Sequence, residues 1–276
     1  MKIAIQGEPG SFSHQATLRV VPDAEIVPCA LSADVFEQLR TGAADAIMIP
    51  IENTLAGSVV EHYDLLRSGD VFIEREAVIR IEHNLIAIPG SRLEEIRRVY
   101  SHPIALAQCR RFFRKHPSVE PVAFYDTAGA VKQVMEQGDP TAGAIASRHA
   151  AMIYGGALLA ENVEDDAKNF TRFLLVQSGA AASHPEGAHK LSLCCRVAHR
   201  PGTLAEVLGE VAAASGNLVH IQSRPVEGHP WHYYVFMDIL MPEAKATDRL
   251  LDTMQALGTE SKVLGRFVAA PEFATV

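Results

Sequence analysis

Several features are scarce in this sequence of 276 residues, and each scarcity excludes a class of protein. There are four cysteines, with Cys194 beside Cys195 and with Cys29 and Cys109 isolated, so the spacing predicts neither a disulfide framework nor a zinc site. The net charge of −8 argues against a broad nucleic-acid-binding face. No apolar run approaches the ~18–20 residues of a membrane span, and the N-terminus lacks the apolar segment of a signal peptide. We therefore expect a cytoplasmic protein that binds neither membrane nor nucleic acid.

What is present is the composition of an ordinary globular protein. Hydrophobic residues make up 48% of the chain and charged residues 21%. At about 100–200 residues per domain, the length suggests one large or two medium domains.

Up to about residue 176, short strand-like runs alternate with helical patterns. Strand-like runs are expected at 2–7, 46–51 and 98–102, and helices from Ser11, at 58–67, at 105–116, from Asp126 or Thr127, and within 143–156. Strands separated by helices of ten to fifteen residues are typical of βαβ units, which form mostly parallel sheets. Residues 71–90 interrupt this rhythm with nearly continuous alternation. We expect a long strand there, with a crossing near 71–82 between two α/β lobes and a return crossing at 168–176.

The composition changes at SGAAASHPEGA (178–188), where small and polar residues indicate a linker. Beyond it the expected order is strand, helix, two strands, helix and strand. This βαββαβ order within about 80 residues predicts a ferredoxin-like domain. The predicted organisation is a first region at 1–178, a linker at 179–188 and a second domain at 189–276.

Polar residues gather at four strand–helix junctions or strand starts of the first region. They lie in the segments GEPGSFSH (7–14), PIENTLAGSVVEH (50–62), SHPIALAQC (101–109) and NFTRFLLV (169–176). In open α/β folds, ligands bind at the carboxyl ends of strands. Each segment taken alone is equally well explained as a capped turn, with Ser11 or Ser101 as the cap. The first lacks the G-x-G-x-x-G pattern, so a dinucleotide site is not expected.

The segment NFTRFLLV places Thr171 and Arg172 inside an apolar run. A buried guanidinium is costly unless an anion meets it. No Ser–His–Asp order, no pair of catalytic carboxylates and no metal-ligand spacing accompanies it. The four segments together predict a site for a small polar anion, without a covalent nucleophile, a metal or a cofactor. The alternative for Arg172 is an interdomain ion pair.

In this order, GEPGSFSHQA, PIENTLAGSV, HNLIAIPG, SHPIALAQC and NFTRFLLV closely resemble the motifs of the prephenate dehydratase family. RPGTL (200–204) and IQSRP (221–225) resemble the ligand-binding motifs of that family's C-terminal ACT regulatory domain. Because the first motif begins about seven residues from the N-terminus, we expect the form without a fused chorismate mutase domain.

The resemblance implies a fold, a reaction and a set of site residues. It implies two α/β lobes around a cleft, similar to periplasmic binding proteins, and the conversion of prephenate to phenylpyruvate, water and carbon dioxide in phenylalanine biosynthesis. Prephenate carries two carboxylates, one of which Arg172 would bind with two hydrogen bonds. The expected catalytic residues are Thr171, Arg172 and Phe173. The expected substrate-binding residues are Ser11, Ser13, Glu52, Asn53, Thr54, Ser101 and Gln108.

Two alternatives remain open, namely an arogenate dehydratase and a non-catalytic amino-acid sensor. A geometric point also remains, because adjacent residues of a regular strand, such as Thr171 and Arg172, face opposite sides.

Regulation by phenylalanine is also implied, with dimers or tetramers formed through the ACT domains. The expected phenylalanine-binding residues are Arg200, Pro201, Gly202, Thr203, Leu204, Gln222, Ser223, Arg224 and Pro225. Thr203 and Gln222 depart from the alanine and glutamate that are usual in the family. Thr203 adds a hydroxyl and Gln222 removes a charge, so we expect weaker phenylalanine binding.

Overall fold

The computed structural model describes residues 1–181, 185–197, 199–256 and 259–273. Residues 182–184 of the expected linker, and residues 198, 257, 258 and 274–276 of the expected second domain, lie outside the described residues. The chain forms two compact units, one of residues 1–57 and 77–173 and one of residues 58–76 and 174–276. Within the part that the structure describes, no helix has the length and apolar character needed to cross a membrane.

The first sheet has the strand order β2-β1-β3-β11-β5, with β4 paired to β3. Strand β1 runs parallel to both β2 and β3. The strands are β1 (Lys2–Gln6), β2 (Glu25–Cys29), β3 (Ala46–Asn53), β4 (Gly57–Ser58), β5 (Val71–Arg80) and β11 (Phe170–Ser178), and the helices are α1 (Phe12–Val20) and α2 (Ser32–Arg40). The predicted βαβ rhythm is confirmed here, and β2 and α2 are additions that the sequence pattern did not reveal.

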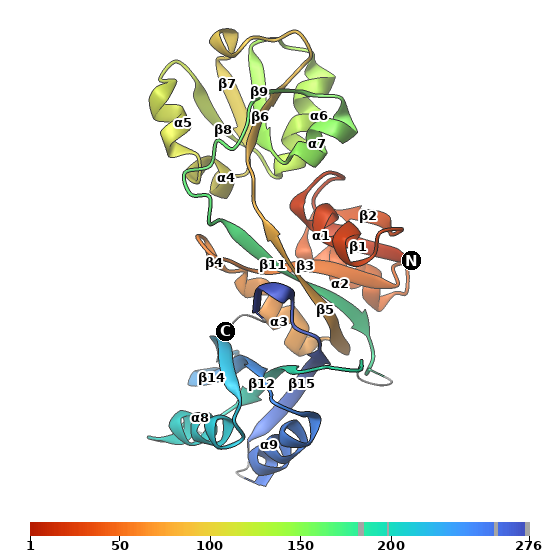
Figure 1. Cartoon of the computed structure of the whole chain (residues 1–276), viewed down its shortest axis with the longest axis vertical. Coiled ribbons are helices and arrows are strands. Elements are labelled where there is room, and N and C mark those ends of the chain that lie inside the picture. Colours follow the sequence, from red (N-terminus) through yellow and green to blue (C-terminus); the bar gives the residue numbers. More distant parts are fainter. Residues whose placement is uncertain (182–184, 198, 257–258, 274–276) are drawn as a thin grey trace. The chain divides into compact units, whose positions relative to one another are not determined.

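A second sheet has the strand order β10-β6-β9-β7-β8. Its strands are β6 (Asn84–Ala87), β7 (Arg98–Ser101), β8 (Glu120–Ala123), β9 (Ala142–Ala146) and β10 (Ala157–Ala160), and its helices are η1 (Leu93–Glu95), α4 (Pro103–Ala107), α5 (Arg110–Lys115), α6 (Thr127–Gln137) and α7 (Arg148–Tyr154). Alternate residues of β6 face opposite sides, so Leu85 packs with the α4 and α5 cluster and Ile86 with the α6 and α7 cluster. Figure 1 shows these helix pairs on the two faces of the sheet.

Two chain segments connect the two sheets. Strand β5 ends at Arg80 in the first sheet and β6 begins at Asn84 in the second. The return passes through Asn169 into β11, and the Ile81 amide donates to the Asn169 carbonyl at 2.8 Å. The first unit therefore has two lobes joined by two neighbouring crossings.

The second unit contains the predicted βαββαβ domain, with strand order β13-β14-β12-β15. Its elements are β12 (Lys190–Arg196), α8 (Thr203–Ala213), β13 (Asn217–Val226), β14 (His229–Leu240), α9 (Ala244–Ala256), β15 (Glu260–Phe267) and η2 (Pro271–Phe273). Apolar residues of α8 and α9, such as Val207 and Leu250, share one core with Leu193 of β12. Figure 1 shows both helices on the same face of this sheet.

Helix α3 (Val60–Ser68) belongs to the second unit and packs with this domain, although it follows β3 and β4 in sequence. The Tyr63 hydroxyl lies 2.7 Å from Nε2 of His220, and its ring meets Phe236 edge to face. Arg224 donates two hydrogen bonds to the Asp64 carboxylate, at 3.2 and 2.6 Å. Aromatic packing and an ion pair thus attach α3 to the sheet.

The prediction of one continuous helix over 105–116 is wrong. Helix α4 ends at Ala107 and α5 begins at Arg110, with Gln108 as the C-cap of α4. The amides of Arg110 and Arg111 donate to the Asp165 carboxylate at 3.0 and 2.8 Å. A helix start supplies amides without helical partners, and Asp165 satisfies two of them. The break holds Gln108 at the end of α4.

Candidate active site

Asn53, the last residue of β3, lies at the centre of a hydrogen-bond network in the first unit. Its Nδ2 lies 2.8 Å from Oδ1 of Asn169 and 2.9 Å from Oγ1 of Thr171. Its Oδ1 accepts from the backbone amides of Leu55 and Ala56 at 3.0 and 2.8 Å. Because a backbone N–H only donates, these two bonds fix which end of the Asn53 side chain is oxygen.

This orientation determines what the Thr171 hydroxyl can do. Since Asn53 Nδ2 donates to Thr171 Oγ1, the oxygen acts as an acceptor in that contact. Its own hydrogen is then available to donate to another group. Thr171 is 9% exposed. The fold therefore presents a shielded hydroxyl whose donor is directed by its neighbour.

Gln108 extends the network to a third segment of the chain. Its Oε1 accepts from Asn169 Nδ2 at 2.9 Å, and its Nε2 donates to Asn53 Oδ1 at 3.4 Å. The same Oε1 lies 3.0 Å from Nε2 of His83. The predicted residues Asn53, Gln108 and Thr171 are thus brought together, from β3, the end of α4 and β11.

Thr54 joins this group through the backbone. Its hydroxyl donates to the Lys168 carbonyl at 2.9 Å and accepts from the Phe170 amide at 3.0 Å. Its own amide donates to the Phe170 carbonyl at 2.9 Å. These bonds fasten the loop after β3 to the start of β11, which sets the distance between Asn53 and Thr171.

Thr171, Arg172 and Phe173 are the second, third and fourth residues of β11, so Arg172 faces away from the other two. Arg172 is 4% exposed and Phe173 is 2% exposed. Thr171 and Arg172 lie near the beginning of the strand, directly after the chain has crossed between the two lobes. The Phe173 ring belongs to the core.

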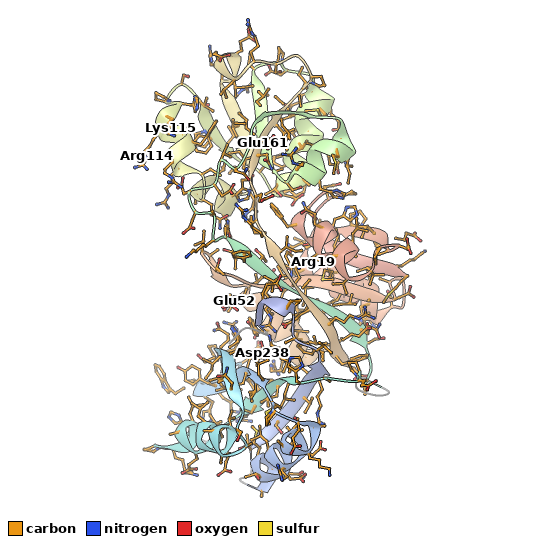
Figure 2. All side chains as sticks on the ribbon, viewed as in Figure 1. Arg19, Glu52, Arg114, Lys115, Glu161 and Asp238 are labelled. Carbon is orange, nitrogen blue, oxygen red and sulfur yellow. The ribbon has the colours of Figure 1, made fainter. Side chains whose placement is uncertain are left out.

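Two of the other predicted substrate-binding residues, Ser101 and Ser11, form hydrogen bonds to groups outside this network. Buried Ser101 donates to the Ile145 carbonyl at 2.6 Å, and Ser11 caps α1 by accepting from the His14 amide at 3.3 Å. Ser13 is buried in α1, and Glu52 is half-buried in β3, where Figure 2 labels it. Phe12, in the segment GEPGSFSH (7–14), contacts the network, because the centroid of its ring lies 5.7 Å from the centroid of the His83 ring.

The loop before α1 contacts the helices of the second lobe. Ser147, the N-cap of α7, donates to the Gly10 carbonyl at 2.7 Å. Gly10 has φ +91°, and a Cβ there would come within 2.7 Å of the Ala150 Cα, so only glycine fits. The Glu8 amide donates to Asp126, the N-cap of α6, at 3.2 Å. Burial raises the pKa of the Asp126 carboxyl, partly offset by the amides that donate to it.

Sequence reasoning missed two members of the network, His83 and Asn169. Both lie within the quoted segments HNLIAIPG and NFTRFLLV, directly before the strands that continue them. His83 is 2% exposed and Asn169 is fully buried. A polar residue directly before a buried strand was a usable signal at both positions.

The residues predicted to bind phenylalanine occupy two places in the second unit. Residues 200–204 lie at the start of α8, where Gly202 is the N-cap with φ +89° and Arg200 forms two hydrogen bonds to Glu206 at 3.0 and 2.7 Å. Residues 222–225 lie on β13, which β14 separates from β12. Buried Thr203 donates its hydroxyl to the Arg200 carbonyl at 3.1 Å.

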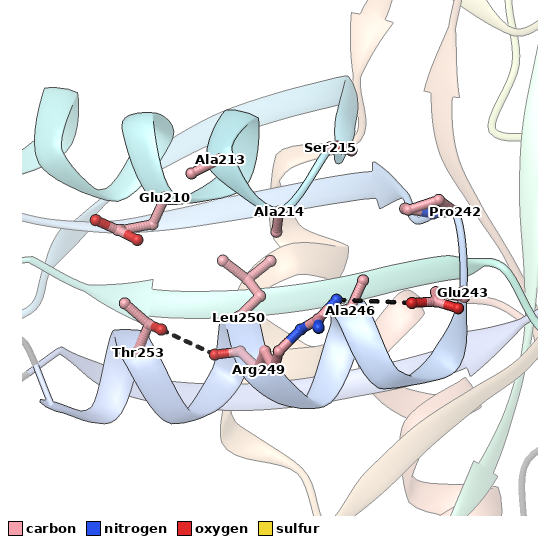
Figure 3. Close-up of a pocket in the computed structure, with 10 residues that line it drawn as sticks. All are labelled: Glu210, Ala213, Ala214, Ser215, Pro242, Glu243, Ala246, Arg249, Leu250 and Thr253. Atoms are coloured by element: carbon pink, nitrogen blue, oxygen red, sulfur yellow. Dashed lines mark hydrogen bonds and ion pairs between the residues drawn. The ribbon is translucent and has the colours of Figure 1, made fainter.

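A separate hollow of about 440 Å³ lies between α8 and α9. Figure 3 shows its lining, in which Arg249 pairs with Glu243 at 3.6 Å. Among the described residues that line it, none belongs to the predicted phenylalanine-binding set.

Comparison with known proteins finds two family models that match the chain. The prephenate dehydratase family model matches residues 3–181, and the ACT domain model matches residues 193–249. The chain belongs to the prephenate dehydratase family. It carries a C-terminal ACT domain, and the expected two-lobed α/β fold with a ferredoxin-like domain is confirmed.

Three similar members of the family differ in the activities that they are named for. The chain is 36% identical over 98% of its length, and 96% of the relative, to a bifunctional N-acyl-homoserine lactone acylase/prephenate dehydratase from Komagataeibacter europaeus. It is 34% identical over 97% of its length, and 72% of the relative, to arogenate dehydratase/prephenate dehydratase 2 of Arabidopsis thaliana. The crystal structure of prephenate dehydratase with L-Phe from Arthrobacter aurescens has a TM-score of 0.87 and 31% identity, covering 97% of this chain and 90% of that one.

Proposed function

We propose that this chain catalyses the decarboxylating dehydration of prephenate to phenylpyruvate, carbon dioxide and water. Membership of the family supports the reaction. The observation that carries the site is the Asn53–Thr171 hydrogen bond of 2.9 Å, whose direction leaves the Thr171 hydrogen free to donate. A buried, oriented donor is what a departing hydroxyl group requires.

The chemistry needs little more than orientation and a donor. As the ring carboxylate leaves as carbon dioxide, the electron pair of the broken C–C bond enters the ring, and the C–O bond of the ring hydroxyl breaks. The departing hydroxide takes one proton to become water, and the ring becomes aromatic. Thr171 donates a hydrogen bond to that oxygen as its negative charge develops. The proton that completes the water molecule comes from solvent.

Arg172 and the remaining polar groups hold the substrate. We assign the Arg172 guanidinium to a prephenate carboxylate and place the ligand at the start of β11, where it can reach both Thr171 and Arg172 although their side chains leave the strand on opposite sides. Gln108, Asn53 and Thr54 act as positioning groups around Thr171. Ser11, Ser13, Glu52 and Ser101 form the margins of the site, and Phe173 supports the strand from the core.

Phenylalanine is the proposed regulatory ligand, bound by residues 200–204 and 222–225. Strand β14 separates the two segments in the sheet of one chain, so a ligand that touches both is best placed where two ACT domains meet. Edge strand β13 supports such pairing, because an unpaired edge is a template for another strand and its Ile221 is 45% exposed. We propose a homodimer or homotetramer in the cytoplasm, with residues 1–178 as the catalytic domain, 179–188 as the linker and 189–276 as the regulatory domain.

One experiment distinguishes the two candidate substrates. The purified chain is incubated with prephenate and, separately, with arogenate, and phenylpyruvate and phenylalanine are quantified. We expect phenylpyruvate from prephenate at a higher kcat/KM than phenylalanine from arogenate. The reverse ratio would make the chain an arogenate dehydratase. No product from either acid would exclude both dehydratase activities.

The Komagataeibacter relative suggests a second candidate function, the hydrolysis of the amide bond of N-acyl-homoserine lactones. The supporting observation is similarity over nearly the whole of both chains. Release of homoserine lactone from an N-acyl-homoserine lactone tests it. The variant Thr171→Ala shows whether such an activity shares the dehydratase site.

A further inference from the structure

His83 occupies an unusual position for a residue with no assigned role. It directly precedes β6, at one of the two crossings between the lobes, and only 2% of its surface is exposed. Its Nε2 lies 3.0 Å from Oε1 of Gln108, and the Phe12 ring meets its ring edge to face at 5.7 Å. Its Nδ1 has no hydrogen-bond partner among the described residues.

The tautomer of His83 follows from a chain of bonds that starts at the backbone. The Leu55 and Ala56 amides make Asn53 Oδ1 an acceptor, so Asn53 Nδ2 donates to Asn169 Oδ1. The other end of the Asn169 side chain is then its nitrogen, which donates to Gln108 Oε1 at 2.9 Å. Because Gln108 Oε1 is an acceptor, the His83 nitrogen that faces it must carry the hydrogen.

We infer that His83, as the neutral Nε2–H tautomer, is a positioning residue that fixes the Gln108 amide within the network around Thr171. This inference rests on the proposed dehydratase function. With His83 donating, Gln108 Oε1 is held by two donors and Gln108 Nε2 is turned toward Asn53. Without that donor, Gln108 Oε1 keeps only the Asn169 donor, so the amide that borders the Asn53–Thr171 pair is held less firmly.

Burial, and not the neighbouring charged groups, favours this neutral state of His83. Glu164 accepts from the His83 backbone amide at 2.9 Å, and Arg80 lies 3.7 Å from Glu164 and 3.1 Å from Glu82. Gln108 and Phe12 are uncharged. Burial lowers the pKa of His83, although the Gln108 hydrogen bond and Glu164 partly oppose the shift. A proton added at Nδ1 would have no acceptor among the described residues.

Protonation of His83 should therefore set the acidic limit of turnover. Burial lowers the pKa of His83 from its ordinary 6.5, so the imidazole stays neutral at pH 7 and gains a proton only as the pH falls below 6.5. Turnover should fall through that same range.

The test uses the full chain and three variants, with the rate without enzyme subtracted at each pH. His83→Phe keeps a buried ring but removes the donor, and should lower kcat about 10- to 100-fold at pH 7.5 with a smaller change in KM. His83→Gln sets an amide N–H near the Nε2 position without a titrating group. It should restore most of that loss and remove the acidic limit. His149→Gln is the matched control, because burial also lowers the pKa of His149 but its ring contacts His14 instead. It should keep the acidic limit.

Two results would overturn the role of His83. One is turnover by His83→Phe within about twofold of the parent, and the other is an unchanged acidic limit in His83→Gln. If the parent chain fails to convert prephenate, the proposed function fails instead. The tautomer is then still tested by ¹⁵N NMR of the imidazoles, with His83 assigned by its absence in His83→Gln. A hydrogen on Nδ1 would contradict the network.

Discussion

Single residues in this site act through the direction of their hydrogen bonds. Two backbone amides orient Asn53, and Asn53 then decides that the Thr171 oxygen accepts and its hydrogen donates. A threonine hydroxyl is a weak acid, so its value lies in a fixed donor and not in proton transfer by itself. Orientation is therefore the property that mutations at this site should disturb first.

Thr171→Ala should lower kcat by about 10²- to 10³-fold, because it removes a donor directed at charge that develops in the transition state. KM should change little, since that interaction is weak in the ground state. Steady-state kinetics with prephenate measure both. Thr171→Ser is the control, because it keeps the hydroxyl beside Asn53. A Thr171→Ala variant with normal kcat would disprove the assignment.

Arg172→Leu should chiefly raise KM. A buried carboxylate left without its partner costs about 2–5 kcal/mol, which should appear as weaker prephenate binding. Arg172→Lys keeps the charge but loses the two parallel N–H donors, so we expect only partial recovery. Circular dichroism of both variants checks the fold. A change in kcat alone, with KM unaltered, would instead place Arg172 at the reacting atoms.

The sequence made some of these residues predictable and hid others. Asn53 and Thr171 stand out as polar residues at the edge of apolar runs, and the motif order suggested their shared site. The bond between Gln108 and His83 joins positions 25 residues apart on separate elements, and no local pattern encodes it. Asp165 likewise caps α5 from 55 residues away, so the break between α4 and α5 could not be foreseen.

At the scale of elements, helix caps connect the two lobes of the first unit. Asp126 caps α6 through the Gly129 amide at 2.8 Å and also accepts from the Glu8 amide in the loop before α1. The Glu8 carboxylate in turn meets Lys132 at 3.2 Å and the Tyr125 hydroxyl at 3.1 Å. The same loop is therefore fastened to the start of one helix by both its backbone and its side chain.

Asp126→Ala should destabilise the first unit by about 1–2 kcal/mol, because it removes an N-cap and leaves the Glu8 amide without its acceptor. For a region of this size, that corresponds to a Tm lower by about 2–8 °C. Asp126→Asn keeps an acceptor oxygen without the buried charge, and should recover most of the loss. Thermal unfolding of the three proteins decides it. Equal Tm values for Asp126→Ala and the parent would show that the cap contributes nothing.

At the scale of the whole molecule, the proposed regulation depends on assembly and on the two unusual residues of the ACT domain. At micromolar concentration we expect a sedimentation mass of a dimer or tetramer of the 29.9 kDa chain. Phenylalanine should bind and lower turnover, as measured by calorimetry and kinetics. A stable monomer, or no heat and no inhibition at millimolar phenylalanine, would contradict this.

The structure separates the effects of those two residues. The Thr203 hydroxyl is already bonded to the Arg200 carbonyl, so Thr203→Ala should change phenylalanine affinity little. Gln222 donates to the neighbouring Ser223 carbonyl at 2.9 Å, and Gln222→Glu would restore a charge beside Arg224. We expect the second variant to bind phenylalanine more tightly than the first.

The bond between the Thr54 amide and the Phe170 carbonyl has a consequence for the chemical ageing of the protein. Asparagine is a thermolabile residue, and its deamidation begins when the next backbone nitrogen attacks the side-chain amide. At Asn53 that nitrogen belongs to Thr54 and is held 2.9 Å from the Phe170 oxygen. Deamidation would turn Asn53 into aspartate, which cannot donate to Thr171. The fold thus protects its central donor, so Asn53 should remain intact on storage.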